Sequence, residues 1–464
     1  MLFSSLTFLF CFLPATVGIY YFARRELRNI VLLLASIFFY AWGEPKYLPI
    51  IFTTITISWL GALVIERFKY KKTLLSLFVF ADLALLIYFK YTSFLLENLN
   101  LLFHKDWSLK VVLPLGISFY TFQALSYLVD VSRGQVKAQK NYLKIALYIC
   151  LFPQLIAGPI VKYHDVSDQI DNRKETIDTI YYGIRRFIIG LAKKVLIANT
   201  LGGIADKIFE QVSDGTTVAV ATAWLGGITK ALQVYYDFSG YSDMAIGLGA
   251  IFGFKFLENF NYPYISRTMS EYWKRWHISL GTWCRDYIYF PMGGSRVAPW
   301  RVYFNLFFLF FIIGLWHGAS WNFILFGVVN GLLIVFEKLI GLPKKKLRFA
   351  FIPVLYLYTI FMFIVNAILA NTETLKQSAL QLKAMFNFTN NEEFFIYHHT
   401  DRVGLILLGI AVLCCMPIFK NMLNWGKKYK IISVFCDLWI TALLIMSCAQ
   451  IATSTYNPFI YFRF

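Results

Sequence analysis

The sequence predicts an all-α integral membrane protein with about ten to twelve spans, plus re-entrant and interfacial helices. Three observations support this fold class. Hydrophobic residues make up 58% of the 464 residues. Charged residues make up only 15%, whereas soluble proteins carry about 25%. Apolar runs of about 20 residues, the length that crosses a bilayer as a helix, recur along the chain. We expect residues 1–464 to form one polytopic domain with a motif-bearing core at 110–331.

Each predicted span is an apolar run, and basic loops set its orientation, because cytoplasmic loops carry an excess of Lys and Arg. The predicted apolar segments are 2–22, 29–42, 47–65, 74–89, 111–129, 145–158, 187–201, 218–234, 302–316, 321–342, 349–369, 403–419 and 431–452. Basic residues place the loops 67–72, 344–348 and 427–430 inside, and leave 90–110, 371–402 and the tail after 452 outside. Residues 133–140 form a basic turn, and the topology of 111–200 stays open. No small-residue cleavage site follows the first segment, so we expect a retained helix rather than a signal peptide.

Two segments depart from simple alternation. The pair Gly158-Pro159 breaks a helix, so the segment 145–158 is expected to be re-entrant. Residues 162–186 are the most polar part of the chain, and we interpret them as a cytoplasmic amphipathic linker with His164 at its surface.

The composition also excludes some classes of protein. The net charge is +18, which in a membrane protein reports cytoplasmic loops and contact with anionic lipids. Nucleic-acid binding is not expected, because no compact basic domain lies outside the membrane. The seven cysteines show no metal-ligand spacing, so neither a metal site nor a disulfide framework is predicted.

The segment Arg301–Gly331 places one histidine, His317, between two apolar arms. The first arm, 302–316, would rise roughly 22 Å as a helix, short of a bilayer core of about 30 Å. His317 is therefore predicted to lie within the membrane, where an ionisable residue is a candidate for function and an imidazole can act as a general base. The alternative is a structural histidine bonded to a nearby carbonyl.

Residues 235–296 form a central segment that combines many polar groups with apolar runs. Asp237, Ser239, Tyr241 and Asp243 precede an apolar run, and buried carboxylates need donors. We interpret them as a polar wall whose partners are Arg or Lys side chains from the later part of the segment. The alternative is that Asp and Ser cap a helix at the membrane edge.

Residues 270–287 are predicted to form one amphipathic helix along the membrane interface, because Trp and Leu recur at spacings of three and four. Its basic residues, Arg275 among them, suit an anionic ligand or anionic lipid. His277 is expected to point inward. Cys284 either contacts the substrate or is a structural thiol.

Five blocks resemble the membrane-bound O-acyltransferase family, in particular its branch that acetylates alginate and other extracellular polysaccharides. The blocks are LGISFYTFQALSYLVDVSRGQ, FPQLIAGPIVKY, YYDFSGYSDMAIGLGAIFGF, NFNYPYISRTMSEYWKRWHISLGTWCRDYIYFPMGGSR and LWHGASWNFILFG. The resemblance implies a fold in which helices surround a thin centre with a funnel on each side. It implies that His317 is the central catalytic histidine and that His277 is the second histidine of the family.

The resemblance further implies a multi-pass protein of the bacterial cytoplasmic membrane that moves an acyl group, expected to be acetyl, from a cytosolic thioester. Acetyl-CoA is the expected donor, and no bound cofactor is expected. Gly318 is expected to leave room for substrate. The candidate residues for binding substrate or the acyl group are Asp237, Ser239, Tyr241, Arg275, Cys284, Trp316 and Asn322. An extracytoplasmic transferase of the serine-hydrolase type is the expected partner, and a polysaccharide is the expected final acceptor.

The final residues, Pro458–Phe464, resemble the aromatic tail motif of this branch. Tyr461 could carry the acyl group as an ester, with His317 as the base for a phenol of pKa about 10. The alternative is an aromatic anchor at the membrane interface. Two rival functions stay open at this point: D-alanyl transfer to teichoic acid, and transport, for which no inverted repeat is visible. A structural scaffold does not explain two membrane-associated histidines.

Overall fold

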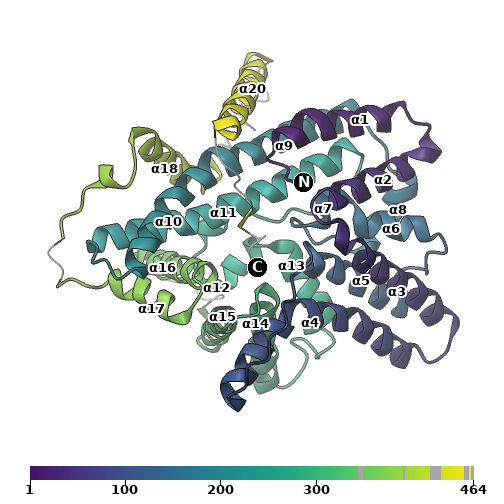
Figure 1. The fold of residues 1–464 in the computed structure, drawn as a ribbon, viewed down its shortest axis with the longest axis horizontal. Coiled ribbons are helices and arrows are strands. Elements are labelled where there is room, and N and C mark those ends of the chain that lie inside the picture. Colours follow the sequence, from purple (N-terminus) through teal and green to yellow (C-terminus); the bar gives the residue numbers. More distant parts are fainter. Residues whose placement is uncertain (343–348, 390–391, 419–429, 454–458, 461–464) are drawn as a thin grey trace. The chain divides into compact units, whose positions relative to one another are not determined.

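The computed structural model describes residues 1–342, 349–389, 392–418, 430–453 and 459–460. Within these residues every regular element is a helix, which confirms the all-α prediction (Figure 1). The chain divides into two compact units. The first comprises Met1–Phe187, Ser242–Glu258 and Arg285–Tyr287, and the second comprises Ile188–Tyr241, Asn259–Cys284 and Ile288–Phe464. Whether these units act as one domain stays a prediction.

The first unit consists mainly of the amino-terminal helices. They are a π-helical turn at Phe8–Phe12, α1 (Leu13–Phe22), α2 (Arg28–Ala41), α3 (Leu48–Arg67), α4 (Lys71–Phe103), α5 (Ile117–Ser132), α6 (Tyr142–Cys150), α7 (Phe152–Leu155), α8 (Tyr163–Asn172) and most of α9 (Ile177–Ala192). Helix α4 is longer than the predicted span 74–89 and takes in part of the predicted outer loop. Helix α6 ends at Cys150, earlier than the break predicted at Gly158-Pro159, and α7 follows as one short turn. Gly158 lies outside both helices and has a positive φ of 105°.

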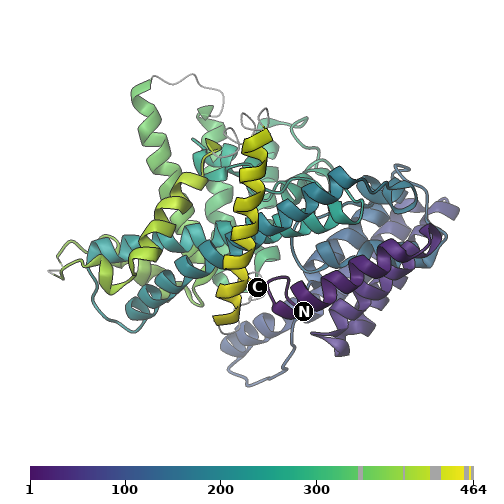
Figure 2. The same ribbon diagram turned by 90° about the horizontal axis from the view of Figure 1, so that it is seen from above.

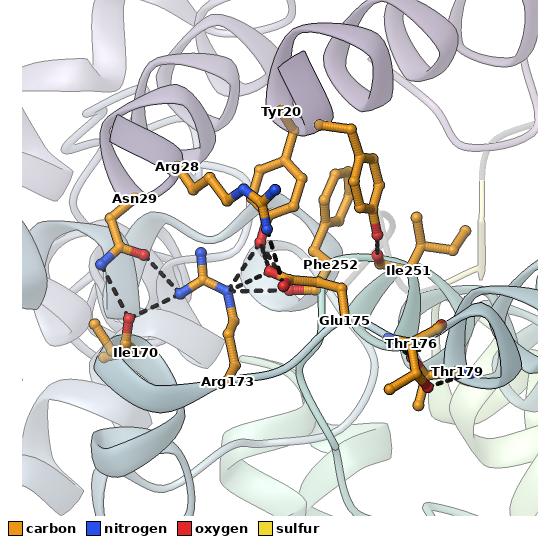
Figure 3. A network of polar contacts seen from close by, with 11 residues as sticks. Tyr20, Arg28, Asn29, Ile170, Arg173, Glu175, Thr176, Thr179, Ile251 and Phe252 are labelled. Atoms are coloured by element: carbon orange, nitrogen blue, oxygen red, sulfur yellow. Dashed lines mark hydrogen bonds and ion pairs between the residues drawn. The ribbon is translucent and has the colours of Figure 1, made fainter. Parts of the chain in front are cut away.

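A polar network ties the predicted linker to the first helices of this unit (Figure 3). Glu175 accepts hydrogen bonds from Tyr20 and from Arg28, the latter at 2.9 Å. Arg173 donates to the side chain of Asn29 at 2.6 Å and to the carbonyl of Phe252 at 3.1 Å. The charges of the linker are therefore partly structural, because they join segments that are distant in the sequence.

The second unit contains the longest continuous helices of the carboxyl-terminal half (Figures 1 and 2). They are a π-helical turn at Lys193–Ala198, α10 (Asn199–Ser213), α11 (Val220–Ile251, shared with the first unit), α12 (Met269–Arg275), α13 (Ile278–Cys284), α14 (Pro299–His317), α15 (Trp321–Leu339), α16 (Ile352–Asn371), α17 (Leu375–Ala384), α18 (Arg402–Cys414) and α20 (Lys430–Thr453). Helix α11 runs straight through Asp237 and Asp243, so these residues do not cap a helix end.

Seven helical segments of the described chain are long and apolar enough to cross a membrane. They are Pro45–Arg67, Lys71–Phe103, Ile177–Ser213, Pro299–His317, Trp321–Leu339, Ile352–Asn371 and Ile431–Thr453. Phe8–Phe22 and Arg402–Cys414 are shorter apolar helices. The chain is therefore a multi-pass membrane protein. The sequence-based number of about ten to twelve is larger because it counts segments such as 145–158, which the structure divides into short helices.

Candidate active site

The candidate site is built on the hairpin of α14 and α15, in the second unit. His317 is the last residue of α14, and α15 begins at Trp321 after a short extended connection. Helix α14 has 19 residues, four more than the predicted arm, and rises about 28 Å. That rise approaches the thickness of a bilayer core, so helix length does not fix the depth of His317, and its burial at 8% exposure is the firmer observation.

Small residues bring the two helices of the hairpin close together. A Cβ on Gly327 would lie 2.7 Å from the carbonyl oxygen of Phe310 and 3.1 Å from the Cα of Gly314. Gly318 makes room for a ring beside His317. A Cβ there would overlap the ring of Phe323, which lies nearly parallel to the imidazole of His317 at 6.2 Å between centroids. The expected role of Gly318 in leaving room for substrate stays a prediction.

His317 lines a cavity of about 50 Å³. The other lining residues are Val234, Tyr264, Tyr272, Trp273, Trp276, Phe323, Phe326, Phe363, Asn366, Ala367, Ala370, Asn371 and Ile460. Aromatic rings form most of the wall, and two asparagines supply amide groups. Since one ordered water needs roughly 10–15 Å³ by this measure, the cavity holds a few waters or a small acyl group.

His277 lies at a break between two short helices, which corrects the prediction of one helix over 270–287. Helix α12 ends at Arg275 and α13 begins at Ile278. His277 has a φ of +47°, a left-handed conformation that a continuous helix cannot contain. The periodic Trp and Leu residues are equally compatible with one helix or with two, so the pattern did not reveal the break. The inward direction was correct, because His277 is 1% exposed.

The hydrogen bonds around His277 fix which ring nitrogen carries the proton. The backbone N–H of Ser279 donates to Oδ1 of Asn259 at 3.3 Å, and its hydroxyl donates to the same oxygen at 2.9 Å. A backbone N–H can only donate, so this oxygen is an acceptor. The Nδ1–H of His277 then donates to it at 3.0 Å. Burial, with His317 nearby, lowers the pKa of His277 well below its ordinary value, so the ring is neutral at pH 7 and Nε2 carries a lone pair.

That lone pair can accept a hydrogen bond. Nε2 of His277 is buried and has no hydrogen-bond partner among the described residues. The ring of Trp316 lies between the two histidines, with its centroid 6.0 Å from that of His277 and 4.9 Å from that of His317. The structure therefore brings His277, Trp316 and His317 together, as expected for one site.

Asp237 contacts two groups that the sequence did not indicate. Its Oδ1 forms a buried ion pair with Lys194 at 2.5 Å, and its Oδ2 accepts a hydrogen bond from the backbone N–H of Ile460 at 2.8 Å. Asp243 pairs with Arg186 at 2.6 Å. The predicted partners from the later part of the segment are thus wrong: both cations precede the carboxylates in the chain.

The other candidate residues differ in how close they lie to this centre. Tyr241 is buried and packs edge-on against Phe459 at 4.6 Å, and the Ser239 hydroxyl is buried without a partner among the described residues. Arg275 forms an ion pair with Glu271 at 2.9 Å and donates a hydrogen bond to the carbonyl of Asn261. These contacts stabilise the segment that contains Arg275.

Asn322 and Cys284 are both buried. Asn322 donates to the carbonyl of Thr372 at 2.6 Å, which joins α15 to the end of α16. Burial raises the pKa of the Cys284 thiol to about 12, which favours the structural alternative for this residue. Tyr461 and the basic cluster 344–348 lie outside the described residues.

Sequence reasoning missed several residues of the site. Asn259 lies in one of the blocks that resemble the family, but Asn261 stands two residues later, so residue type alone did not single out Asn259. Glu337 is completely buried and accepts the N–H groups of Met269 and Ser270 at 2.6 and 2.8 Å, so α15 caps the start of α12. Lys194 was visible as a charge within the apolar segment 187–201, but neither Lys194 nor Ile460 could be paired with Asp237, because each is distant from it in the sequence.

Comparison with known proteins identifies the class of protein to which this chain is similar. Residues 51–377 match the membrane-bound O-acyltransferase (MBOAT) family. The chain is 37% identical to the probable alginate O-acetylase AlgI of Pseudomonas putida, with all of both chains covered. It is 35% identical to the peptidoglycan O-acetyltransferase of Helicobacter pylori, over all of this chain and 98% of that protein. A teichoic acid D-alanyltransferase of Bacillus subtilis is 29% identical over 48% of this chain and 60% of its own.

The chain therefore belongs to the membrane-bound O-acyltransferase family. Its all-helical fold, its membrane spans and the matched region agree with this assignment. Family membership assigns it to enzymes that transfer acyl groups to oxygen, rather than to transporters or scaffolds. The region 51–377 contains both histidines and the cavity-lining residues of α11 to α16.

Proposed function

We propose that this protein transfers an acetyl group from a cytosolic thioester, acetyl-CoA, across the membrane for O-acetylation of an extracellular or periplasmic polysaccharide. The observation that carries this proposal is the small cavity beside His317, whose size suits the few non-hydrogen atoms of an acetyl group. The names of the full-length relatives, a probable alginate O-acetylase and a peptidoglycan O-acetyltransferase, support a polysaccharide as the final acceptor.

In this proposal His317 is the general base. An acceptor hydroxyl gives its proton to the imidazole while its oxygen attacks the thioester carbonyl. The tetrahedral intermediate then collapses, the carbon–sulfur bond breaks, and the leaving thiolate takes the proton back from the imidazolium. The products are an oxygen ester and a free thiol. The lone pair on Nε2 of His277 accepts a hydrogen bond from a bound substrate, and Trp316 keeps the two rings apart.

The first acceptor in this proposal is the phenol of Tyr461, which would carry the acetyl group outward as an ester. Its neighbour Ile460 lines the cavity that contains His317, which supports an acceptor role over a simple interfacial anchor. A separate extracytoplasmic transferase of the serine-hydrolase type would then move the acetyl group to sugar. The protein would reside in the bacterial cytoplasmic membrane, in contact with anionic lipids.

D-alanyl transfer to teichoic acid is the second candidate function, and the cavity favours acetyl over it. A D-alanyl group carries an ammonium, which needs a carboxylate or a similar partner when it is buried. None of the fourteen described residues that line the cavity is acidic. The D-alanyltransferase relative also matches a smaller part of the chain.

The test is acetyl transfer by purified protein in lipid nanodiscs with acetyl-labelled CoA. We expect wild type to gain a labelled ester on the tail peptide, and Tyr461→Phe to lose it. His317→Ala should lower transfer by about a hundredfold or more, because it removes the base. His104→Ala is the matched control, since His104 is an exposed histidine at the end of α4. Full activity of His317→Ala, or a D-alanyl thioester serving better than acetyl-CoA, would overturn the proposal.

A further inference from the structure

We infer that the buried pair Lys194–Asp237 is a clamp that holds the tail segment Phe459–Ile460 by its main chain and so presents the next residue to the cavity of His317. This inference rests on the proposed function in one respect: the tail is the first acyl acceptor. It adds a positioning role for two residues that the acyl-transfer chemistry itself does not require.

The two oxygens of the Asp237 carboxylate have different partners. One pairs with the ammonium of Lys194 and the other accepts the N–H of Ile460. Lys194 and Asp237 are each 2% exposed. Burying an ion pair is costly unless further hydrogen bonds satisfy the charges, and the backbone of the tail supplies one. Without the tail, one oxygen of a buried carboxylate would lose this donor.

The side chains of the tail segment also contact the residues of the clamp. The ring of Phe459 lies under the ammonium of Lys194, 4.9 Å from Nζ to the centroid, and edge-on to Tyr241. Phe459 is 1% exposed and Ile460 is 6% exposed. The same lysine therefore contacts the tail directly through a cation–π interaction and indirectly through Asp237.

The place of the clamp distinguishes it from a general anchor. Ile460 is part of the wall of the cavity that contains His317, so the clamped N–H belongs to a residue already at the site. Tyr461 is the next residue in the sequence after Ile460. Lys194 lies in a π-helical turn, a feature that often occurs at functional positions in helices.

The first test measures release of the tail without measuring activity. Ile460→Cys keeps the clamped N–H and places a thiol at the cavity wall. We expect N-ethylmaleimide to label this thiol at least about tenfold faster when Asp237→Ala is added, because roughly 1.4 kcal/mol of local stability is a factor of ten. Labelling is read for each peptide by mass spectrometry. Native Cys284, 1% exposed, is the internal control, and its rate must not change.

The second test leaves the buried ion pair intact. Ile460→Pro removes the N–H that donates to Asp237 while both charged side chains stay in place, and Ile460→Val is the control that keeps this N–H. We expect Ile460→Pro to lower acetylation of the tail at least about tenfold relative to Ile460→Val, because the main chain of the tail is no longer held.

The outcomes separate the two claims. Equal labelling rates with and without Asp237→Ala, while Cys284 stays protected, would overturn the clamp even if the tail is acetylated. Faster labelling, together with a wild-type tail that never carries acetyl, would uphold the clamp and reject the tail as acceptor. Equal acetylation of Ile460→Pro and Ile460→Val would overturn the presenting role of the clamp.

Discussion

At the scale of single residues, His277 and His317 lie in one unit but in surroundings of different kinds. His317 faces a cavity among aromatic rings. His277 is buried beside Asn259 and Ser279, and the hydrogen bonds among these residues fix its neutral tautomer. The sequence indicated both histidines, through their residue type and the resemblance. It could not indicate the tautomer, because that depends on a hydrogen bond that His277 donates to a residue 18 positions away.

The residue-scale prediction concerns Asn259. Asn259→Ala removes the acceptor that orients His277, so kcat for acetyl transfer should fall about ten- to a hundredfold with the donor KM nearly unchanged. Ser279→Ala is the control, because it leaves the bond between His277 and Asn259 in place, and we expect less than about a twofold effect. Steady-state kinetics of both variants make the comparison. A change in KM alone for Asn259→Ala would show that Asn259 serves binding and not orientation.

At the scale of elements, the hairpin of α14 and α15 places His317. The apolar arms on either side of this histidine were readable in the sequence, and α14 and α15 begin and end within a few residues of the predicted arms. The close approach through Gly314 and Gly327 is a tertiary feature, because a glycine in an apolar helix does not reveal which backbone it meets.

The element-scale prediction tests this approach. Gly327→Leu inserts a side chain where backbone atoms of α14 already lie within 3.2 Å of a Cβ, so the helices must separate. We expect a loss of about 1–3 kcal/mol in stability, seen as a lower melting temperature in detergent. Gly409→Leu on α18 is the matched control, since nothing lies within 4 Å of a Cβ there. Equal melting temperatures for the two variants would contradict tight packing of the hairpin.

At the scale of the whole molecule, charged residues join distant segments within each unit. In the first unit His164, predicted to be a surface residue, bonds through Nδ1 to the buried Asp130 at 2.8 Å and through Nε2 to Asp165 at 3.2 Å. Tyr287 donates to the other oxygen of Asp130 at 2.7 Å. The hydrogen bond to Asp130, followed by that to Asp165, raises the pKa of His164 to about 9.

The whole-molecule prediction is a pH dependence of stability. The folded pKa of His164 lies above the unfolded value near 6.5, so its contribution is full below about pH 6.5 and is lost as the pH rises through about 9. Because His164 is partly exposed, we expect a modest effect: the melting temperature of wild type should fall by about 2 °C more than that of His164→Gln between pH 6.5 and 9.5. Thermal melts of both proteins at the two pH values provide the check, and parallel shifts would show that the pair adds no stability.

The sequence by itself determined the membrane class, the helical content, the family and the two histidines, because these depend on local composition, periodicity and short motifs. Only the tertiary structure decided the break at His277, the cavity beside His317, and the joining of Lys194, Asp237 and Ile460. These features depend on contacts between residues far apart in the chain and on one left-handed backbone conformation, which local composition and periodicity do not specify.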